Sequence, residues 1–196
     1  MKLFYSSSSP FVRKVSACAI AGGLENRITP VTTNPWQSTP ELLGQNPLSK
    51  VPCLVTEDGL ALFDSPVICE YLDSIGDGAV FPPSGPARWR ALKLQAIADG
   101  IMDAAIVRRL EQARPTEEAR NDVMARQQSA VTRGLDTLEQ DPPADHLDIG
   151  TISVACALGY LDFRFAAEAW RPSRPKLALW FAAMQERPEI AQTAPS

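Results

Sequence analysis

The sequence predicts a small α/β domain followed by an all-α domain. Over residues 1–78, short runs typical of β-strands alternate with helical stretches, and the strand signal disappears further along the chain. Residues 82–86, rich in proline and glycine, form the composition break expected of a domain boundary. A chain of 196 residues has room for one to two domains. We therefore place the domains at residues 1–78 and 86–196.

The first domain is expected to contain strands and helices in the order β-α-β, then β-β-α. Gly22 and Gly23 end the first helix, because glycine adopts the helix-terminal conformation without a Cβ penalty. Asp58-Gly59 predicts a tight hairpin between the last two strands. The proline-punctuated stretch 34–48 is predicted to be a loop with a short helical piece. The expected elements cover residues 2–5, 10–21, 28–32, 53–56, 61–63 and 66–75.

The second domain is expected to contain helices only. Apolar residues recur at helical spacing, as at Leu92, Ile97 and Ile101 in the first of these helices. The second helix is very polar and begins with Pro-Thr-Glu-Glu (residues 115–118). The predicted helices cover residues 88–111, 116–140, 149–166 and 175–186.

Composition excludes several classes of protein. With 45% hydrophobic and 21% charged residues, the chain can bury a sizeable core and is not a disordered tail. The net charge of −4 gives no basic surface for nucleic acid or an anionic membrane. The longest apolar run, residues 154–161, is far too short to span a bilayer. The polar start of the chain does not resemble a signal peptide, so we expect a soluble, cytoplasmic protein.

Cysteine and histidine usage argues against a metal site. The four cysteines are far apart and form no Cys-x-x-Cys, and His146 is the single histidine. We expect Cys18, Cys69 and Cys156 to be buried small hydrophobes. Cys53 is the cysteine with a possible functional role, since it directly follows a proline of interest described below.

Two serine-proline pairs stand at predicted helix starts. Ser9-Pro10 is typical of a helix N-cap followed by proline, which requires no ligand to explain it. The same arrangement can hold an anion, because free N–H groups and the helix dipole favour negative charge. Ser65-Pro66 repeats the pattern, and Asp64 beside it can receive an ammonium group. This second site suits both halves of an amino-acid zwitterion.

A third motif, Val51-Pro52, precedes a predicted strand. A trans proline opening a strand is ordinary. A cis bond would turn the Val51 backbone outward, so that it could pair with a bound peptide as an added strand. The residues alone leave both forms of the Val51–Pro52 bond open.

Together these segments resemble the cytosolic glutathione transferases, in particular the small bacterial proteins of that type. The resemblance covers essentially the whole chain and rests on residues 6–14 (SSSSPFVRK), 46–52 (NPLSKVP) and 63–72 (FDSPVICEYL). It implies a thioredoxin-like first domain and a helical second domain that lines an electrophile pocket. Glutathione is the implied co-substrate, without a metal, and a small hydrophobic electrophile is the partner in a detoxifying conjugation. The resemblance also implies a homodimer.

The resemblance assigns the glutathione-binding roles by position. The Val51 backbone, beside a cis Pro52, matches the residue that pairs with the cysteinyl unit. Asp64 and Ser65 match the pair that holds the γ-glutamyl end. Lys50, with Gln37 as a further possibility, matches the position that binds the glycyl carboxylate.

Ser9 matches the catalytic serine or cysteine of the serine-type and cysteine-type classes. Ser7 and Ser8 stay open as alternatives, because the run of four serines blurs the alignment. With neither tyrosine nor cysteine at position 9, the tyrosine classes and the thiol-transfer classes are disfavoured. Arg13, one turn further along the helix, is a source of long-range charge.

Other positions are assigned on the same basis. For the electrophile pocket we name Phe11, Met102 and Ile106, and Trp36 can border the site. Asp99 and Asp103 share a helix face at i, i+4 spacing, which is typical of a solvated pair. The resemblance adds that Asp103 reaches glutathione bound by the other subunit. From the residues alone, we expect Trp89, Trp170 and Trp180 to pack in the core or between helices, and His146 to be exposed.

One departure from the family lies outside the proposed site. The family's helical domain usually carries Ser or Thr, two residues, then Asp, whereas here the order is Asp148-Ile149-Gly150-Thr151. The residue types of the capping box are thus exchanged. Two rival functions stay open: another glutathione-dependent reaction, such as disulfide exchange, peroxide reduction or isomerisation, and a non-enzymatic binding or scaffold protein.

Overall fold

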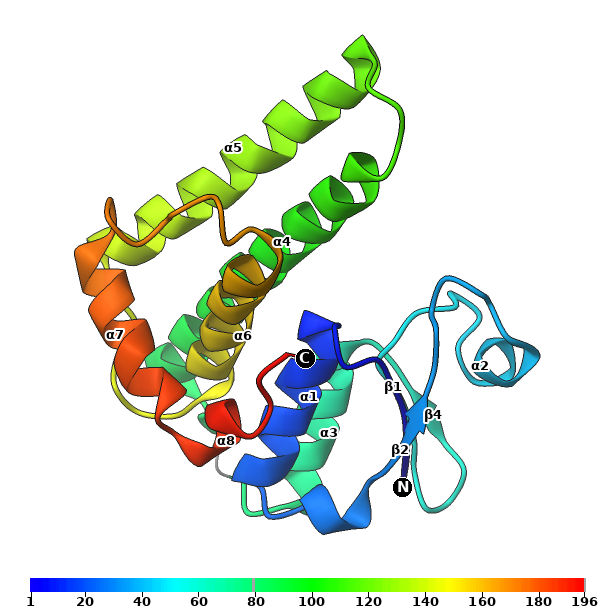
Figure 1. Cartoon of the computed structure of the whole chain (residues 1–196). Helices are drawn as coiled ribbons and strands as arrows, with labels where there is room; N and C mark the ends of the chain where they lie inside the picture. Colours follow the sequence, from blue (N-terminus) through cyan, green and yellow to red (C-terminus); the bar gives the residue numbers. More distant parts are fainter. Residues whose placement is uncertain (79, 196) are drawn as a thin grey trace.

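The computed structural model describes residues 1–78 and 80–195. Its first part confirms the predicted order of strands and helices and adds a short 3₁₀-helix, η1 (Figure 1). The elements are β1 (Lys2–Tyr5), α1 (Pro10–Ala21), η1 (Glu25–Arg27), β2 (Thr29–Thr32), α2 (Pro40–Gln45), β3 (Cys53–Val55), β4 (Ala61–Leu62) and α3 (Ser65–Ile75).

The four strands form one mixed sheet in the order β2-β1-β3-β4. β1 pairs with β2 in parallel and with β3 antiparallel, so that Phe4 lies opposite Cys53. β3 and β4 form the hairpin predicted from Asp58-Gly59, and Gly59 has the positive φ of 88° that this turn requires. Helices α1 and α3 lie together on one side of the sheet, and α2 lies on the other (Figure 1).

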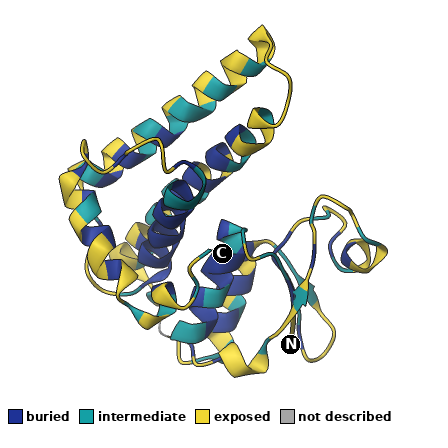
Figure 2. Ribbon diagram, in the orientation of Figure 1, coloured by how far each residue is buried: buried dark blue, intermediate teal, exposed yellow. Residues whose placement is uncertain are grey.

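The second part is helical throughout, as expected. Its helices are α4 (Gly85–Gln112), α5 (Glu118–Gln140), α6 (Ile149–Arg164), α7 (Pro175–Gln185) and α8 (Pro188–Ala191), of which α8 was not predicted. The long helices α4 and α5 extend side by side away from the α/β part, and α6, which packs against α4, is almost wholly buried (Figure 2). Because α6 packs against both α4 and α1, it joins the helical part to the helix that begins at Ser9.

The exchanged capping box at the start of α6 is complete. The Thr151 backbone N–H donates to Asp148 Oδ1 at 2.9 Å, and the Asp148 N–H donates to Thr151 Oγ1 at 2.8 Å. Exchanging the two residue types therefore preserves both hydrogen bonds of this cap. His146 is 65% exposed, as expected, and its Nε2 lies 3.0 Å from Asp148 Oδ2.

Two expectations about local packing are wrong. Helix α3 begins at Ser65 with Asp64 as the N-cap residue, so Ser65 is not the cap. Trp89 is 69% exposed, whereas Trp170 and Trp180 are buried as expected. Trp89 lies in the first turns of α4, on a face that residues 1–78 and 80–195 leave exposed.

Gly150 allows α6 to approach α4 closely, and its replacement is our first test of the fold. A Cβ at this position would lie 2.6 Å from the Ala91 carbonyl oxygen and 2.7 Å from Leu94 Cβ. We expect Gly150→Ala to lower the free energy of unfolding by about 1–3 kcal/mol, because overpacking displaces backbone. Gly100→Ala in α4 is the control, since nothing lies within 4 Å of its added Cβ. This control should stabilise the protein by about 0.5–1 kcal/mol. Urea unfolding measures both, and equal stabilities would contradict the close α4–α6 contact.

Candidate active site

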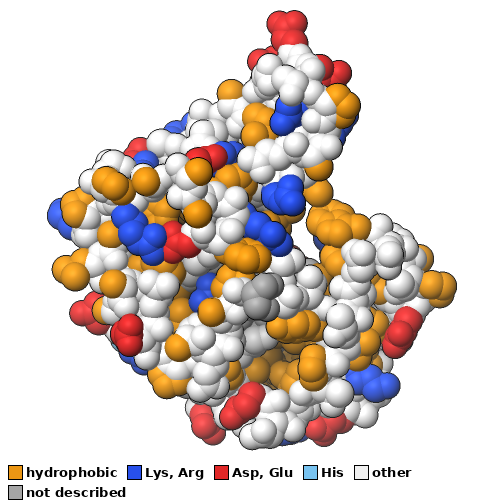
Figure 3. Space-filling view, in the orientation of Figure 1, with side chains coloured by type: hydrophobic (Ala, Val, Ile, Leu, Met, Phe, Trp, Pro, Cys, Tyr) orange, Lys and Arg blue, Asp and Glu red, His pale blue; other side chains and the backbone are white. Residues whose placement is uncertain are grey.

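A cleft of about 400 Å³ lies between the α/β part and the helical part. Figure 3 shows the hollow between the two parts from one side, with basic side chains along its helical edge. Its α/β wall consists of Ser6, Ser8, Ser9, Pro10, Phe11, Pro35, Trp36, Ser49, Lys50 and Val51. Its helical wall consists of Asp103, Ile106, Arg109, Leu110, Ala113, Tyr160 and Arg164.

Ser9 lines this cleft and also caps helix α1. Its backbone is extended, Pro10 follows as the first helical residue, and its Oγ accepts a hydrogen bond from the Val12 N–H at 3.3 Å. A hydroxyl that accepts this bond keeps its own proton free to donate to a ligand. Ser8 also lines the cleft, whereas Ser7 borders a different groove beside β2. Capping α1 therefore leaves the Ser9 hydroxyl proton available to a ligand in the cleft.

The loop that leads into β3 supplies Lys50 and Val51 to the cleft. The Val51–Pro52 bond is cis, as predicted. Asn46 fixes the shape of this loop: its Nδ2 donates to the Lys50 carbonyl at 2.9 Å, and its Oδ1 accepts from the Leu48 N–H at 3.0 Å. Asn46 enters the sequence analysis only as part of the 46–52 motif; in the structure it is buried and holds the loop that carries Lys50.

Asp64 and Ser65 form the start of α3 and do not line the cleft itself. Ser65 is 1% exposed, Asp64 is exposed, and the Phe63–Asp64 bond is cis. The Asp64 carboxylate is close enough to Asp103 to raise the pKa of that side chain. Burial is the main cause of the raised pKa of Asp103, and the nearby Lys50 ammonium opposes it. The start of α3 is thus close enough to the cleft for the charges of Asp64 and Asp103 to interact.

The structure separates the residues named for the electrophile pocket. Phe11 and Ile106 line the cleft, and so does Trp36, which is largely exposed. Met102 is fully buried in the core and does not line it, so the prediction for Met102 is wrong. Gln37 is likewise not part of the lining.

Three polar residues of the helical wall were not predicted from the sequence: Arg109, Tyr160 and Arg164. Arg109 comes from the last turns of α4, and the other two come from the end of α6. Tyr160 and Arg164 are four residues apart, which places them on one helix face. That spacing was the available signal, but which way the face points depends on helix packing.

The cysteine thiols offer no nucleophile to the cleft. All four are free and buried. Burial raises the pKa of Cys53 to about 11, and burial also raises the pKa of Cys156 to about 11. The pKa of Cys18 is raised chiefly by its hydrogen bond with Cys69 and further by burial. These three thiols are therefore protonated at neutral pH, which argues against a functional role for Cys53.

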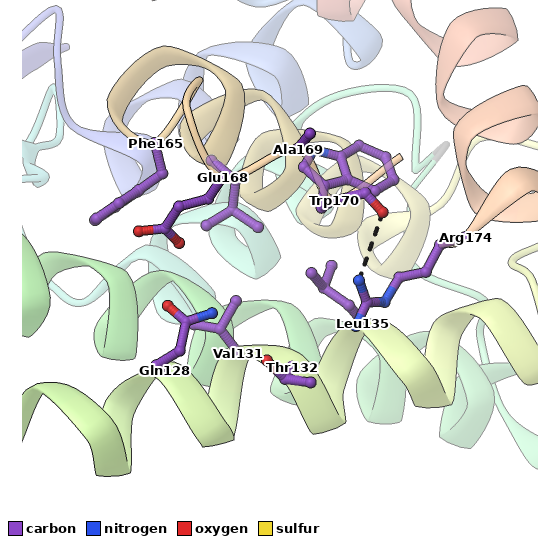
Figure 4. A pocket seen from close by; sticks show the side chains of 10 residues that line it. Gln128, Val131, Thr132, Leu135, Phe165, Glu168, Ala169, Trp170 and Arg174 are labelled. Carbon is purple, nitrogen blue, oxygen red and sulfur yellow. Dashed lines mark hydrogen bonds between the residues drawn. The ribbon is translucent and has the colours of Figure 1, made fainter. Parts of the chain in front are cut away.

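A second cavity, of about 290 Å³, lies between α5 and the loop after α6 (Figure 4). It shares no residue with the Ser9 cleft. Its charged groups are already paired, since Arg174 contacts Asp136 and Glu168 contacts Arg108.

Within the described part of the chain, no helix is long and apolar enough to cross a membrane. The same residues contain no cluster of three or more His, Cys, Asp or Glu side chains that could hold a metal ion.

A small mixed sheet with a cis-proline loop, joined to a helical part across a cleft, defines the two-domain glutathione transferase fold. The chain belongs to the glutathione S-transferase family. The N-terminal domain of that family matches residues 8–75, and its C-terminal domain matches residues 121–183.

Relatives of known sequence and structure agree with this assignment. The chain is 38% identical to the uncharacterized GST-like protein YibF of Escherichia coli K12, over 100% of this chain and 98% of that protein. A glutathione transferase family member from Pseudomonas fluorescens Pf-5, crystallised with bound glutathione, is 40% identical with a TM-score of 0.92, covering 100% of this chain and 98% of that one. A crystal structure of a family member from the same bacterium holds S-(propanoic acid)-glutathione; it is 40% identical with a TM-score of 0.90 and full coverage of both chains (100%).

Proposed function

We propose that this protein binds glutathione and conjugates its thiolate to a small electrophile. The observation that carries the proposal is the Ser9 hydroxyl, which stands at the N-terminus of α1 and lines the interdomain cleft together with Val51. A thiol placed there meets a hydrogen-bond donor and the positive end of a helix dipole.

The binding mode follows the residues named from the sequence. The Val51 backbone, next to the cis bond, pairs with the cysteinyl unit as an added strand. Asp64 receives the γ-glutamyl ammonium group, and Ser65 with the α3 N-terminus receives its carboxylate. Lys50, which lines the cleft, receives the glycyl carboxylate.

The hydrogen bond from Ser9 and the N-terminus of α1 supply enough free energy to lower the pKa of the glutathione thiol. A thiol with a pKa of about 8.5 is only a few per cent thiolate at pH 7, and lowering the pKa by about two units requires about 2.7 kcal/mol. A hydrogen bond to a charged group contributes about 1.5–3 kcal/mol, and a helix N-terminus contributes about 0.3–2 kcal/mol. One serine and one helix end therefore suffice.

The relatives support both halves of the proposal. One Pseudomonas fluorescens protein binds glutathione, and the thioether of S-(propanoic acid)-glutathione has the bonding of a conjugation product. The buried, protonated cysteines argue against the rival disulfide exchange. A scaffold protein that binds glutathione without turnover is the other rival, and a conjugation assay with 1-chloro-2,4-dinitrobenzene separates it from the enzyme.

We extend the proposal to assembly and location. The exposed apolar side chains of Leu60, Val67 and Trp89 lie on β4, α3 and α4 or beside them, and they suit burial against a second copy of the chain. In such a homodimer, Asp103 completes the glutathione site of the other subunit. Detoxification of electrophiles in the cytoplasm is the role that this assembly would serve.

The γ-glutamyl contacts give the direct test of binding. We expect Asp64→Ala and Ser65→Ala each to weaken glutathione binding by about 1–3 kcal/mol, as for hydrogen bonds to charged groups. Titration calorimetry measures the affinity, and thermal unfolding reports any loss of helix stability. Asp77→Ala, an exposed acid beyond the other end of α3, is the matched control. Unchanged affinity in both site variants would mean that Asp64 and Ser65 act only on the helix start.

A further inference from the structure

The helical wall of the cleft carries a concentration of positive charge. Arg109 and Arg164 line the cleft together with the hydroxyl-bearing Tyr160. Both guanidinium groups are close enough to Tyr160 to lower the pKa of its phenol, against the larger raising effect of burial. The three polar groups therefore converge, although they come from two different helices.

Neither guanidinium has an acidic partner among residues 1–78 and 80–195. Neighbouring arginines behave differently: Arg108 pairs with Glu168, and Arg171 pairs with Asp162. The Arg164 Nε is buried without a hydrogen-bond partner, and its guanidinium stacks on the Phe163 ring with the two centres 4.1 Å apart. A fixed, partly desolvated cation of this kind is costly unless a ligand compensates it.

Asp103, the acidic residue of the cleft, lies apart from Arg109 and Arg164. Asp103 lines the same cavity, but the cations that lower the pKa of its carboxyl are Lys50 and Lys14. Neither arginine contributes to that shift. The cleft thus has one region in which acid and lysine charges balance, and another in which the positive charge is unbalanced.

We propose that the electrophile accepted by this site carries a carboxylate, which Arg164, Arg109 and the Tyr160 hydroxyl hold. A planar guanidinium matches a carboxylate with two parallel hydrogen bonds, and a phenol supplies a third donor. The apolar Phe11, Trp36 and Ile106 around this region suit the carbon skeleton of an aromatic or unsaturated acid. This inference rests on the proposed function and sharpens the expectation of a merely hydrophobic substrate.

A carboxylate electrophile and its uncharged methyl ester provide the test. In 4-chloro-3,5-dinitrobenzoate, the glutathione thiolate attacks the ring carbon that bears chlorine. The C–S bond forms, the C–Cl bond breaks, chloride leaves with the electron pair, and the thiol proton passes to solvent. The methyl ester of the same acid undergoes the same reaction without the negative charge.

We expect the wild-type protein to favour the acid over the ester by at least about tenfold in kcat/KM, each divided by its uncatalysed rate. Arg164→Met should lower this acid-to-ester ratio by about ten- to a hundredfold. Arg109→Met should lower it less, because Arg109 is exposed. Arg126→Met, an exposed arginine of α5 outside the cleft, is the control and should leave the ratio unchanged. A ratio near one in the wild type, or one insensitive to Arg164→Met, would overturn the inference.

Binding of the two glutathione adducts tests the carboxylate site separately from the proposed conjugation. If neither electrophile is conjugated, the proposed conjugation fails, and calorimetry with the two glutathione adducts then tests the inference by itself. Tighter binding of the acid adduct, lost in Arg164→Met, would support the carboxylate site. Equal binding of the two adducts, or binding of neither, would refute it.

Discussion

Replacing Ser9 with alanine is expected to lower conjugation near neutral pH by about ten- to a hundredfold. The hydroxyl lines the cleft and keeps its proton free, because its oxygen accepts from the Val12 N–H. Losing a hydrogen bond worth about 1.5–3 kcal/mol to the thiolate corresponds to one to two pKa units. Glutathione affinity should change little, since the proposed binding mode assigns most of the contacts to Val51, Asp64 and Ser65.

The conjugation rate of Ser9→Ala should depend on pH in a way that identifies the lost thiolate contact. Ser9→Ala raises the pKa of the bound thiol, so the thiolate fraction falls at neutral pH and recovers once the pH exceeds the raised value. Ultraviolet titration of protein-bound glutathione measures the thiol pKa directly. The recovery should be visible as partial return of the conjugation rate at higher pH.

Two further variants distinguish loss of the hydroxyl from loss of the helix cap. Ser9→Ala also removes a helix cap, at a cost of about 0.5–2 kcal/mol in stability, whereas Ser9→Thr keeps both the cap and the hydroxyl and should restore activity. Ser9→Cys should add its own thiol and gain disulfide exchange with glutathione. An identical thiol pKa in wild type and Ser9→Ala would shift the role to Ser8, which also lines the cleft, rather than to Ser7.

The parts of the site that depend on local sequence were predictable. The serine cap at Ser9 and the hairpin at Asp58-Gly59 each depend on a few adjacent residues, and the cis bond before Pro52 was predicted from the resemblance to the family. The start of α3 was predicted only to within one residue. Its cap is Asp64, because a helix end can shift by a residue without changing the loop before it.

The parts that depend on packing between helices were not predictable. Met102 and Ile106 are one turn apart on α4, yet only Ile106 reaches the cleft while Met102 is buried in the core. Residues four apart share a helix face, so the difference depends on which neighbouring helices cover that face at each turn of α4, and the apolar pattern does not specify this. The meeting of Arg109 with the Tyr160–Arg164 face of α6 has the same origin.

The polar pair Arg13-Lys14 shows a second limit of sequence reasoning. Charged residues in an amphipathic helix normally face water, but here both are buried, because α1 lies between the sheet and the helical part. Arg13, considered as a long-range aid to the thiolate, directs its Nη2 to the Ile190 carbonyl at 3.0 Å. Lys14 contacts an acid of the other domain. Neither partner could be named from the pattern of α1 alone.

The Lys14–Asp99 contact is a buried ion pair between the two domains. The Lys14 Nζ lies 2.7 Å and 2.9 Å from the two carboxylate oxygens of Asp99. The Lys14 side chain is 0% exposed, and that of Asp99 is 20% exposed. Burial raises the pKa of Asp99, and the Lys14 ammonium opposes that shift. Each charge therefore depends on the other for compensation in a poorly solvated place.

Breaking this pair is expected to cost more stability than any other single ion-pair change in the chain. Lys14→Met and Asp99→Asn should each lower the free energy of unfolding by about 3–5 kcal/mol, because one buried charge is left without its partner. The double variant should recover much of that loss, since replacing both charges removes the uncompensated ion. Arg27→Met is the matched control, because the Arg27–Glu57 pair is exposed on both sides (46% and 62%). An exposed pair contributes about 0–1 kcal/mol. Urea unfolding of the four variants measures these differences, and a Lys14→Met cost no larger than that of Arg27→Met would refute the role of the pair in joining the domains.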